Sequence, residues 1–193
     1  MTKNKALIIG NGITRKKFDL EKAAKDHITF GCNALYRDFK PDWLTSLDGG
    51  MITEIKNSGF PDDRLYIPDV EDQYEPAYYN PNRPRENAGM LSMRLAISKG
   101  FRELYCVGMD FLIANYDTNM NNVYRGTQNY GPRTMANMQD NENRAKYFAW
   151  FTKENHDVKF IMMFPHGIWN FRAIDVRSNV TGAAIHHYYL NGD

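Results

Sequence analysis

Short apolar runs recur along the chain, and each gives way to a glycine or a polar residue. The run at residues 6–9 stops at Gly10-Asn11-Gly12, and the run at residues 28–32 stops at Asn33. Short continuous apolar runs of this kind are typical of parallel strands that are buried on both faces. The same pattern predicts further strands at residues 43–47, 64–67, 103–107 and 158–163.

Helical patterns lie between these strands. One of them, apolar over much of its circumference, covers residues 90–99, begins after Asn87-Ala88-Gly89 and ends at Gly100. Strands that alternate with helices predict an α/β fold, here a single Rossmann-like domain over residues 1–193 with a mostly parallel sheet and helices on both faces. The other helices are predicted at residues 19–25, 51–57 and 140–155.

Two long segments fit neither pattern and are predicted to be loops or lids. Residues 68–86 are rich in proline and tyrosine, and residues 112–139 are rich in asparagine, tyrosine and glycine. Because few apolar residues anchor the second segment, we expect it to be mobile when the site is empty. The tail, residues 169–193, is predicted to hold a short helix or strand.

The polar residues that follow the strands should meet at one edge of the sheet, where open α/β sheets bind ligands. Gly10 and Gly12 allow a positive φ and close approach by another group, and Asn11 offers an amide at the mouth. The third glycine of the usual dinucleotide fingerprint is missing, since Arg15 stands there, and Asn33 replaces the acidic ribose ligand. The turn is therefore interpreted as a nucleotide-facing turn without an ordinary NAD site.

Several of the charged residues near this edge allow two roles. Asp48 either holds a ligand hydroxyl or caps the helix after it, and Asp110 belongs either to the site or to a turn. The basic trio at residues 15–17 either neutralises a phosphate or is a solvated face. His166, after the last clear strand, is the acid/base candidate, with backbone hydrogen bonding as the alternative.

Composition limits the classes of partner. The chain has 193 residues, 42% of them hydrophobic, and a net charge of +1, so it fits one domain without a nucleic-acid surface. No signal pattern or membrane-spanning run occurs, which predicts a cytoplasmic protein. Cys32 and Cys106 are the two cysteines, and we expect reduced core thiols. No strict Asp-x-Asp motif occurs, and we expect no bound metal or other cofactor.

Four blocks in order resemble the bacterial sialyltransferases of glycosyltransferase family 42 and related domains of unknown function. They are residues 8–12, 30–36, 87–89 with the following helix, and 100–111. The resemblance implies a CMP-activated sugar as donor substrate, a glycan acceptor, metal-independent transfer and a homo-oligomer. It assigns donor contacts to Asn11 and Asn33, and it matches Arg85 to the family's arginine near the acceptor.

The chain departs from this family at the catalytic half of the site. The family's general base is a histidine that is missing at about residues 138–140, so the base has either moved to His166 or been lost. Leu112 stands where one phosphate-binding tyrosine is expected. The substitutes are Tyr116, Tyr124 and Tyr130, and Arg125 is a further candidate for contact with the phosphate.

Three hypotheses about function therefore remain at this point. The first is a sialyltransferase-like glycosyltransferase. The second is a magnesium-dependent, diphosphokinase-like enzyme that uses Asp48 and Asp110. The third is a non-catalytic nucleotide- or glycan-binding protein. The candidate binding residues are Gly10, Asn11, Gly12, Asn33, Asp48, Asn87, Ala88, Gly89, Asp110, Tyr116, Tyr124, Arg125 and Tyr130, with His166 and Arg85 as catalytic candidates.

Overall fold

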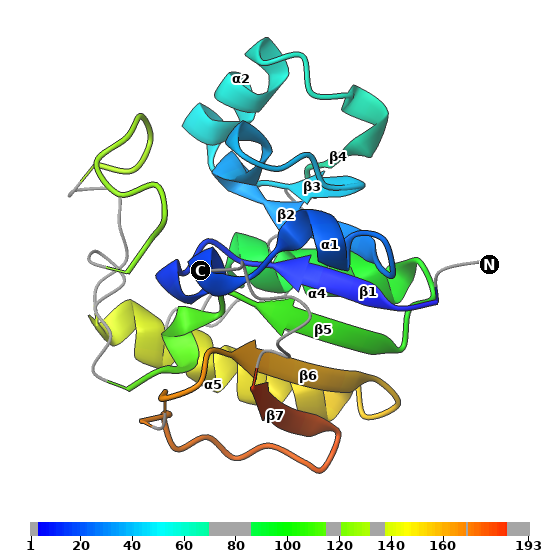
Figure 1. Ribbon diagram of the computed structural model, residues 1–193, viewed down its shortest axis with the longest axis vertical. Helices are drawn as coiled ribbons and strands as arrows, with labels where there is room; N and C mark the ends of the chain where they lie inside the picture. The colour runs from blue at the N-terminus through cyan, green and yellow to red at the C-terminus, as the bar shows by residue number, and fades with distance from the viewer. Residues whose placement is uncertain (1–3, 70–85, 115–120, 132–137, 169, 185–193) are drawn as a thin grey trace.

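The structure, a computed structural model, describes residues 4–69, 86–114, 121–131, 138–168 and 170–184. These residues form one seven-stranded sheet in the order β4-β3-β2-β1-β5-β6-β7, and every neighbouring pair is parallel (Figure 1). The predicted mostly parallel α/β fold is confirmed. The strands are β1 (Ala6–Ile9), β2 (Ile28–Cys32), β3 (Trp43–Thr45), β4 (Leu65–Tyr66), β5 (Glu103–Val107), β6 (Lys159–Phe164) and β7 (Val180–Ala184).

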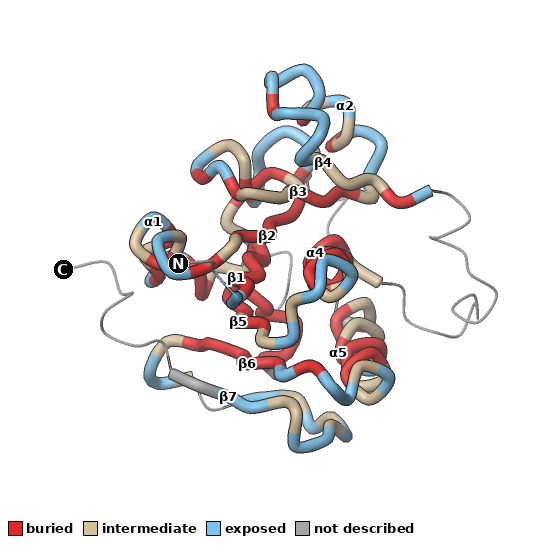
Figure 2. Tube along the Cα trace, turned by 90° about the vertical axis from the view of Figure 1, so that its right-hand side faces the viewer, coloured by how far each residue is buried: buried red, intermediate tan, exposed pale blue. Residues whose placement is uncertain are grey.

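Helices cover both faces of the sheet. Figure 2 shows α4 (Ala88–Ser98) and α5 (Met138–Glu154) on one side of the strands and α1 (Leu20–Ala23) on the other. The helix α2 (Gly49–Asn57) packs into the same core cluster as α1. Short 3-10 helices complete the connections: η1 (Ile13–Lys17), η2 (Asn33–Arg37), η3 (Asp62–Arg64) and η4 (Asp110–Leu112).

The central strand β1 supplies both halves of the core. Ile8 packs into the cluster under α4 and α5, whereas Leu7 and Ile9 pack into the opposite cluster, and all three are fully buried. Successive side chains of a strand point to opposite faces, so a strand covered on both sides must be apolar at every position. This is why a continuous apolar run, rather than an alternating one, encodes the middle of the sheet.

The strand order reverses between β1 and β5. From β1 the chain adds β2, β3 and β4 on one side, and it then crosses back to place β5 against the other side of β1. Such a reversal separates the loops that leave the two strands, and open parallel sheets bind ligands in the crevice that results. The turns that follow β1 and β5 therefore mark the first place to look for a site.

Element ends differ from the sequence-based prediction in a few places. The first helix, α1, is shorter than the predicted range 19–25: Asp19 caps its start by accepting a hydrogen bond from the Lys22 N–H at 2.9 Å, and the helix ends at Ala23. β3 ends at Thr45 rather than at residue 47. In the tail, β7 adds to the sheet beside β6, from Phe160 paired with Val180 onward. The tail thus contains a strand.

Residues 121–131 of the second predicted loop are better anchored than expected. Tyr124 and Tyr130 are 6% and 8% exposed and belong to the core cluster that contains Leu7 and Ile9. The backbone N–H of Val123 donates to the Asn11 carbonyl at 2.9 Å, and that of Ile13 donates to the Asn121 carbonyl at 2.8 Å. The expectation that few apolar side chains hold this segment is wrong for these residues, because its tyrosines point inward.

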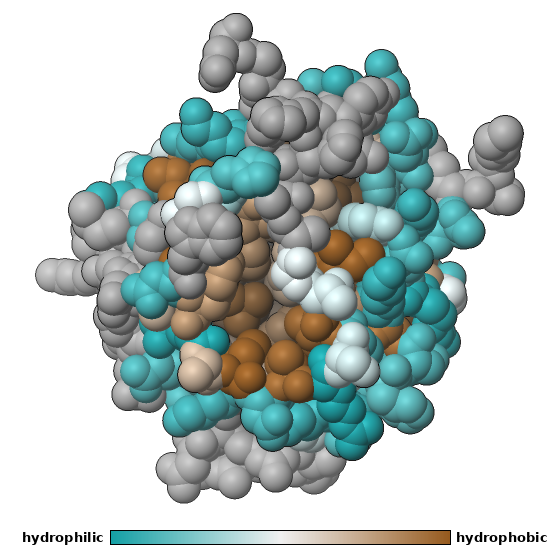
Figure 3. Space-filling view, turned by 60° about the horizontal axis from the view of Figure 1, so that its bottom comes forward, coloured by the Kyte–Doolittle hydropathy of each residue, from teal (hydrophilic) through white to brown (hydrophobic). Residues whose placement is uncertain are grey.

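Some apolar residues lie at the surface as well as in the two core clusters. On the face shown in Figure 3, apolar residues gather around a central hollow and hydrophilic residues lie outside them. Phe171 is 43% exposed, and its ring centroid lies 4.8 Å from that of Phe164.

None of the described helices is long and apolar enough to cross a bilayer.

Candidate functional site

A cavity of about 320 Å³ lies at the point where the strand order reverses. Its walls come from the turns after β1, β2, β3 and β5, from the first turn of α4, from residues 121–130 and from α5. The volume is within the range of small-molecule sites, and the position is that of ligands in open parallel sheets. We call it the switch-point cavity and take it as the candidate site.

Most of the binding residues expected from the sequence line this cavity. They come from four strand ends, a helix start and the 121–131 loop, which the parallel sheet brings to one edge. Arg85 and Tyr116 lie outside the described residues. The residues that line the cavity are Gly10, Asn11, Gly12, Asn33, Asp48, Asn87, Ala88, Gly89, Asp110 and Tyr130.

Three expected residues lie away from the cavity wall. Tyr124 is buried in the core, and Arg125 next to it is exposed. His166 is exposed in the turn after β6. Because β5 separates β6 from β1, the end of β6 does not contribute to the wall, and no histidine is among the described lining residues.

The glycines of the first turn are required by packing between two backbone turns. A Cβ on Gly10 would lie 2.5 Å from the Gly108 carbonyl oxygen, and a Cβ on Gly12 would overlap the Asp110 carboxyl group. Of the two properties expected of these glycines, the close approach is confirmed, whereas neither Gly10 nor Gly12 has a positive φ. The positive φ belongs to Gly108, at 69°. The N–H groups of Gly10 and Gly12 donate to the carbonyls of Val107 and Gly108, at 2.9 and 3.0 Å, and so are not turned toward a ligand.

Asp110 joins the turns after β1 and β5. Its carboxylate accepts hydrogen bonds from the Thr14 N–H at 3.2 Å and from the Thr14 hydroxyl, and the side chain is 4% exposed. Burial raises the pKa of Asp110 to about 6, although the hydrogen bonds from Thr14 and Ile13 lower it. Asp110 therefore holds the start of η1, as the turn role predicts, and it also forms part of the cavity wall, where its role toward a ligand stays a prediction.

Asn11 supplies an acceptor that has no donor. Its side-chain Nδ2 donates to the Cys32 carbonyl at 3.0 Å and to the Tyr130 hydroxyl at 3.4 Å. Its Oδ1 is buried and finds no hydrogen-bond partner among the described residues, and the side chain as a whole is 8% exposed. A buried acceptor without a donor is costly, so a donor supplied by a ligand would stabilise this arrangement.

Asn33 and Asp48 form the adjacent wall. Asn33 has a positive φ of 50°, which asparagine tolerates better than most residues, and its Oδ1 accepts from the Ser46 hydroxyl at 2.9 Å. Its Nδ2 lies 3.5 Å from Asp48 Oδ2. Asp48 occupies the position before α2 but makes no side-chain capping bond, so the capping interpretation is not supported. The Asp48 carboxylate is exposed at the cavity instead.

The first turn of α4 forms a further part of the cavity wall. Asn87 caps this helix, since its Oδ1 accepts from the Met90 N–H at 2.9 Å. Thr45 on β3 donates to the Ala88 carbonyl at 2.9 Å, and Ser92 on α4 donates to the Gly31 carbonyl at 2.9 Å. These bonds fix α4 against β2 and β3, so the start of the helix is held rigidly beside the cavity.

The cysteine in the wall is not a nucleophile at neutral pH. Burial raises the pKa of the Cys32 thiol to about 12, and only the thiolate reacts readily. Burial also raises the pKa of Cys106, which does not line the cavity. Both cysteines are free and buried, as the sequence predicts.

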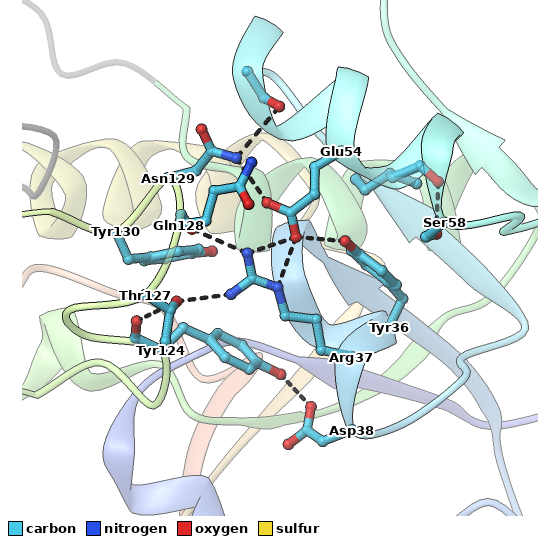
Figure 4. A network of polar contacts seen from close by, with 12 residues as sticks. Tyr36, Arg37, Asp38, Glu54, Ser58, Tyr124, Thr127, Gln128, Asn129 and Tyr130 are labelled. Carbon is cyan, nitrogen blue, oxygen red and sulfur yellow. Dashed lines mark hydrogen bonds and ion pairs between the residues drawn. The ribbon is translucent and has the colours of Figure 1, made fainter.

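A polar network, the Arg37 network, fastens residues 121–131 beside the cavity (Figure 4). Arg37 in η2 donates to the Thr127 hydroxyl at 2.7 Å and to the Gln128 carbonyl at 3.0 Å. Its Nε also donates to Glu54 of α2 at 2.7 Å, and the second oxygen of Glu54 accepts from Asn129 Nδ2 at 2.7 Å. Arg37 thereby ties together a strand turn, a helix and the loop that carries the lining residues Asn121, Asn122, Asn129 and Tyr130.

Glu54 is the carboxylate at the centre of the Arg37 network. Burial alone would raise the pKa of Glu54, but hydrogen bonds from Tyr36, Arg37 and Asn129 outweigh it and hold the pKa below its ordinary value. The carboxylate therefore stays ionised at neutral pH and keeps its three donors.

A second set of contacts lies under the same loop. Arg15 is 4% exposed, and its Nη2 contacts Asp38 Oδ2 at 3.2 Å and the Tyr124 hydroxyl at 2.6 Å. The Tyr124 hydroxyl also hydrogen-bonds Asp38. Arg15 thus points into the protein rather than toward a phosphate in the cavity, while Lys16 and Lys17 are exposed. The phosphate role considered for this trio is not supported for Arg15.

Sequence reasoning missed several wall residues, of which Arg144 matters most for chemistry. Arg144 lines the cavity from α5, on the helical stripe that also carries the buried residues Asn141, Ala145 and Phe148. Arg144, Ala145 and Phe148 follow Asn141 at spacings of three, four and seven, the spacing of the buried face of a helix, where side chains are usually apolar. An arginine at such a position is the signal that could have identified Arg144. The other lining residues missed are Cys32, Gly50, Met51, Gly108, Met109, Phe111, Asn121, Asn122 and Asn129.

The described residues contain no group of three or more histidine, cysteine, aspartate or glutamate side chains that could hold a metal ion. Asp48 and Asp110, the pair considered for magnesium, both line the cavity. However, the Asp110 oxygens already accept hydrogen bonds from Thr14. This donor set does not favour the diphosphokinase-like hypothesis.

Comparison with known proteins gives a likeness of fold. No family model matches the chain, and no curated protein matches it. The sialyltransferase CstII from Campylobacter jejuni in complex with cytidine-5'-monophosphate is 16% identical, with a TM-score of 0.48 over 92% of this chain and 87% of that one. The same enzyme in complex with CMP-3FNeuAc is 16% identical, with a TM-score of 0.42 over 92% of each chain. At these values the likeness carries no argument about activity, which must rest on the residues of the cavity.

Proposed function

We propose that the switch-point cavity binds a CMP-activated sugar and that the chain transfers the sugar to a glycan hydroxyl without a bound metal ion. The observation that carries the proposal is the wall itself. Carboxamides from four segments, with Arg144 as the cation, surround a cavity at the ligand position of the fold. They belong to Asn11, Asn33, Asn87, Asn121, Asn122 and Asn129.

Carboxamides suit a cytidine nucleotide for a chemical reason. The cytosine edge presents an amino donor beside acceptors, and a carboxamide offers both a donor and an acceptor. The unpartnered Oδ1 of Asn11 is the acceptor best placed to receive a ligand N–H or O–H. The acidic residue that would hold an NAD ribose is replaced by Asn33, which supports a nucleotide sugar over a dinucleotide.

The proposed reaction forms one bond and breaks one bond at the anomeric carbon. The acceptor oxygen forms a bond to the anomeric carbon. The bond between the anomeric carbon and the phosphate oxygen breaks, and CMP leaves with the electron pair of that bond. The proton of the acceptor hydroxyl passes to a general base. Asp48 is exposed at the cavity, and among the described residues it makes only one long hydrogen bond, so we assign the base role to Asp48 rather than to His166.

Release of CMP from CMP-sugars, with and without glycan acceptors, tests this assignment. We expect Asp48→Asn to lower kcat by about 100-fold, the lower end of the usual contribution of a general base. Donor affinity should change little, and His166→Ala should leave kcat unchanged because His166 does not line the cavity.

Loss of activity in His166→Ala, but not in Asp48→Asn, would return the base role to His166. Binding of CMP by the wild-type chain without any CMP release would favour the third hypothesis, a non-catalytic binding protein. The absence of a histidine from the described wall is the observation that keeps this hypothesis in view.

A further inference from the structure

Arg144 differs from the other arginines that are not exposed. Arg15, Arg37, Arg94 and Arg172 each have a carboxylate oxygen within 4.0 Å, at 3.2, 2.5, 3.1 and 3.9 Å. Arg144 has no such ion pair with any residue that the structure describes. Among the described residues its one hydrogen bond runs from Nη1 to Asn141 Oδ1 at 3.4 Å, near the limit of a useful contact. A half-buried guanidinium thus faces the cavity, and the part of the chain that the structure describes leaves most of its donors unused.

The charges around Arg144 also favour the binding of an anion. Burial lowers the pKa of the guanidinium, and the more distant charges of Asp140 and Asp48 only partly offset this effect. The group remains charged, since an arginine side chain is not deprotonated in proteins. A buried cation without a close counter-ion is unfavourable, and an anion entering the cavity would relieve it.

We infer that Arg144 is the phosphate-binding residue of the switch-point cavity, which rests on the proposed nucleotide-sugar function. A guanidinium presents parallel N–H donors that match two oxygens of a phosphoryl group. In the transfer reaction, negative charge grows on the phosphate oxygen as its bond to the sugar breaks, and Arg144 stabilises that charge. This assigns the phosphate contact to a residue of α5. The sequence had suggested loop residues for this contact, namely the tyrosines or Arg125.

Comparison of CMP with cytidine isolates the phosphate contribution. We expect the wild-type chain to bind CMP more tightly than cytidine, and Arg144→Gln to weaken CMP binding by about 30-fold, the range of a hydrogen-bonded charge pair. Cytidine affinity should stay unchanged in this variant. Arg144→Lys should recover part of the CMP affinity, because it keeps the charge but not the paired donors. Arg102→Gln, at an exposed ion pair, is the matched control for removal of an arginine.

Three outcomes would overturn the inference. CMP affinity that is unchanged in Arg144→Gln would place the phosphate elsewhere. Equal weakening of CMP and cytidine, or a lowered melting temperature without ligand, would mean that Arg144 only supports the fold. Tighter binding of acetate than of inorganic phosphate, with loss of acetate binding in Arg144→Gln, would make Arg144 a carboxylate site.

Failure of the proposed function gives a different result. If the wild-type chain binds neither cytidine nor CMP, the cytidine assignment falls, and inorganic phosphate then tests Arg144 by itself. Phosphate protection against urea that disappears in Arg144→Gln would sustain the anion site, and no protection of the wild-type chain would refute it.

Discussion

Replacement of Gly10 by alanine is expected to lower the free energy of unfolding by about 3 kcal/mol, the upper part of the usual range for overpacking. The added Cβ would lie 2.5 Å from the Gly108 carbonyl oxygen, a distance that real Cβ contacts essentially never show. The neighbour is backbone, and Gly10 itself is held by its N–H bond to Val107 at 2.9 Å. Neither turn can move without separating the ends of β1 and β5. Urea unfolding at neutral pH measures the loss.

Gly49→Ala is the matched control for this prediction. Gly49 is the first residue of α2, is exposed, and a Cβ there would have no atom within 4 Å. Alanine is the better helix former, so this variant should be as stable as the wild-type chain or slightly more so. Equal stability of Gly10→Ala and Gly49→Ala would show that the two turns are not packed as closely as the structure has them.

Removal of the Arg37 side chain is expected to cost about 2 kcal/mol, since it leaves the Glu54 carboxylate without its charged partner. It also deletes the bonds to Thr127 and Gln128 that fasten residues 121–131 (Figure 4). The Arg37 and Glu54 side chains are 22% and 15% exposed, so water screens the pair only partly. We therefore expect Arg37→Ala to lower stability and also to weaken ligand binding at the wall formed by Asn129 and Tyr130. Urea unfolding measures the loss of stability, titration with CMP measures the loss of ligand binding, and proteolytic cleavage within 121–131 reports release of the loop.

Arg102→Ala provides the control for Arg37→Ala. Arg102 pairs with Asp157 at 2.8 Å, but the two side chains are 49% and 58% exposed. Exposed pairs contribute little, so this variant should lose less than about 1 kcal/mol and keep loop cleavage at the wild-type rate. The same stability and the same cleavage rate for both variants would contradict the role of the Arg37 network in holding the loop.

The sheet could be predicted from the sequence because its strands are buried on both faces. Ala6–Ile9, Ile28–Cys32 and Glu103–Val107 are apolar runs bounded by polar residues or glycine, and the structure has strands of those bounds. Parallel strands then bring their following turns to one edge, which is why Asn11, Asn33 and Asp110 were expected near one another. Local patterns and the rules of parallel sheets suffice for this much.

The rest of the site depends on contacts that local patterns do not encode. The bond between Arg37 and Thr127 joins residues 90 positions apart, and it helps to decide that loop 121–131 lies beside the cavity. The inward direction of Arg15 likewise depends on Asp38 and Tyr124. The glycine turn was interpreted by its conformational freedom and by close approach of another group. The close approach, by the turn after β5, is what requires glycine at Gly10.

The relative affinity of the wild-type chain for nucleoside monophosphates tests the central claim most directly. Calorimetric titration with CMP, AMP and GMP, each with and without Mg²⁺, compares the base and the metal requirement in one experiment. If the switch-point cavity is a metal-independent CMP-sugar site, CMP should bind at least about tenfold more tightly than AMP or GMP, a difference of about 1.4 kcal/mol. CMP should also bind equally well with and without Mg²⁺. Affinity for CMP no greater than for AMP and GMP, or binding that appears only with Mg²⁺, would contradict it.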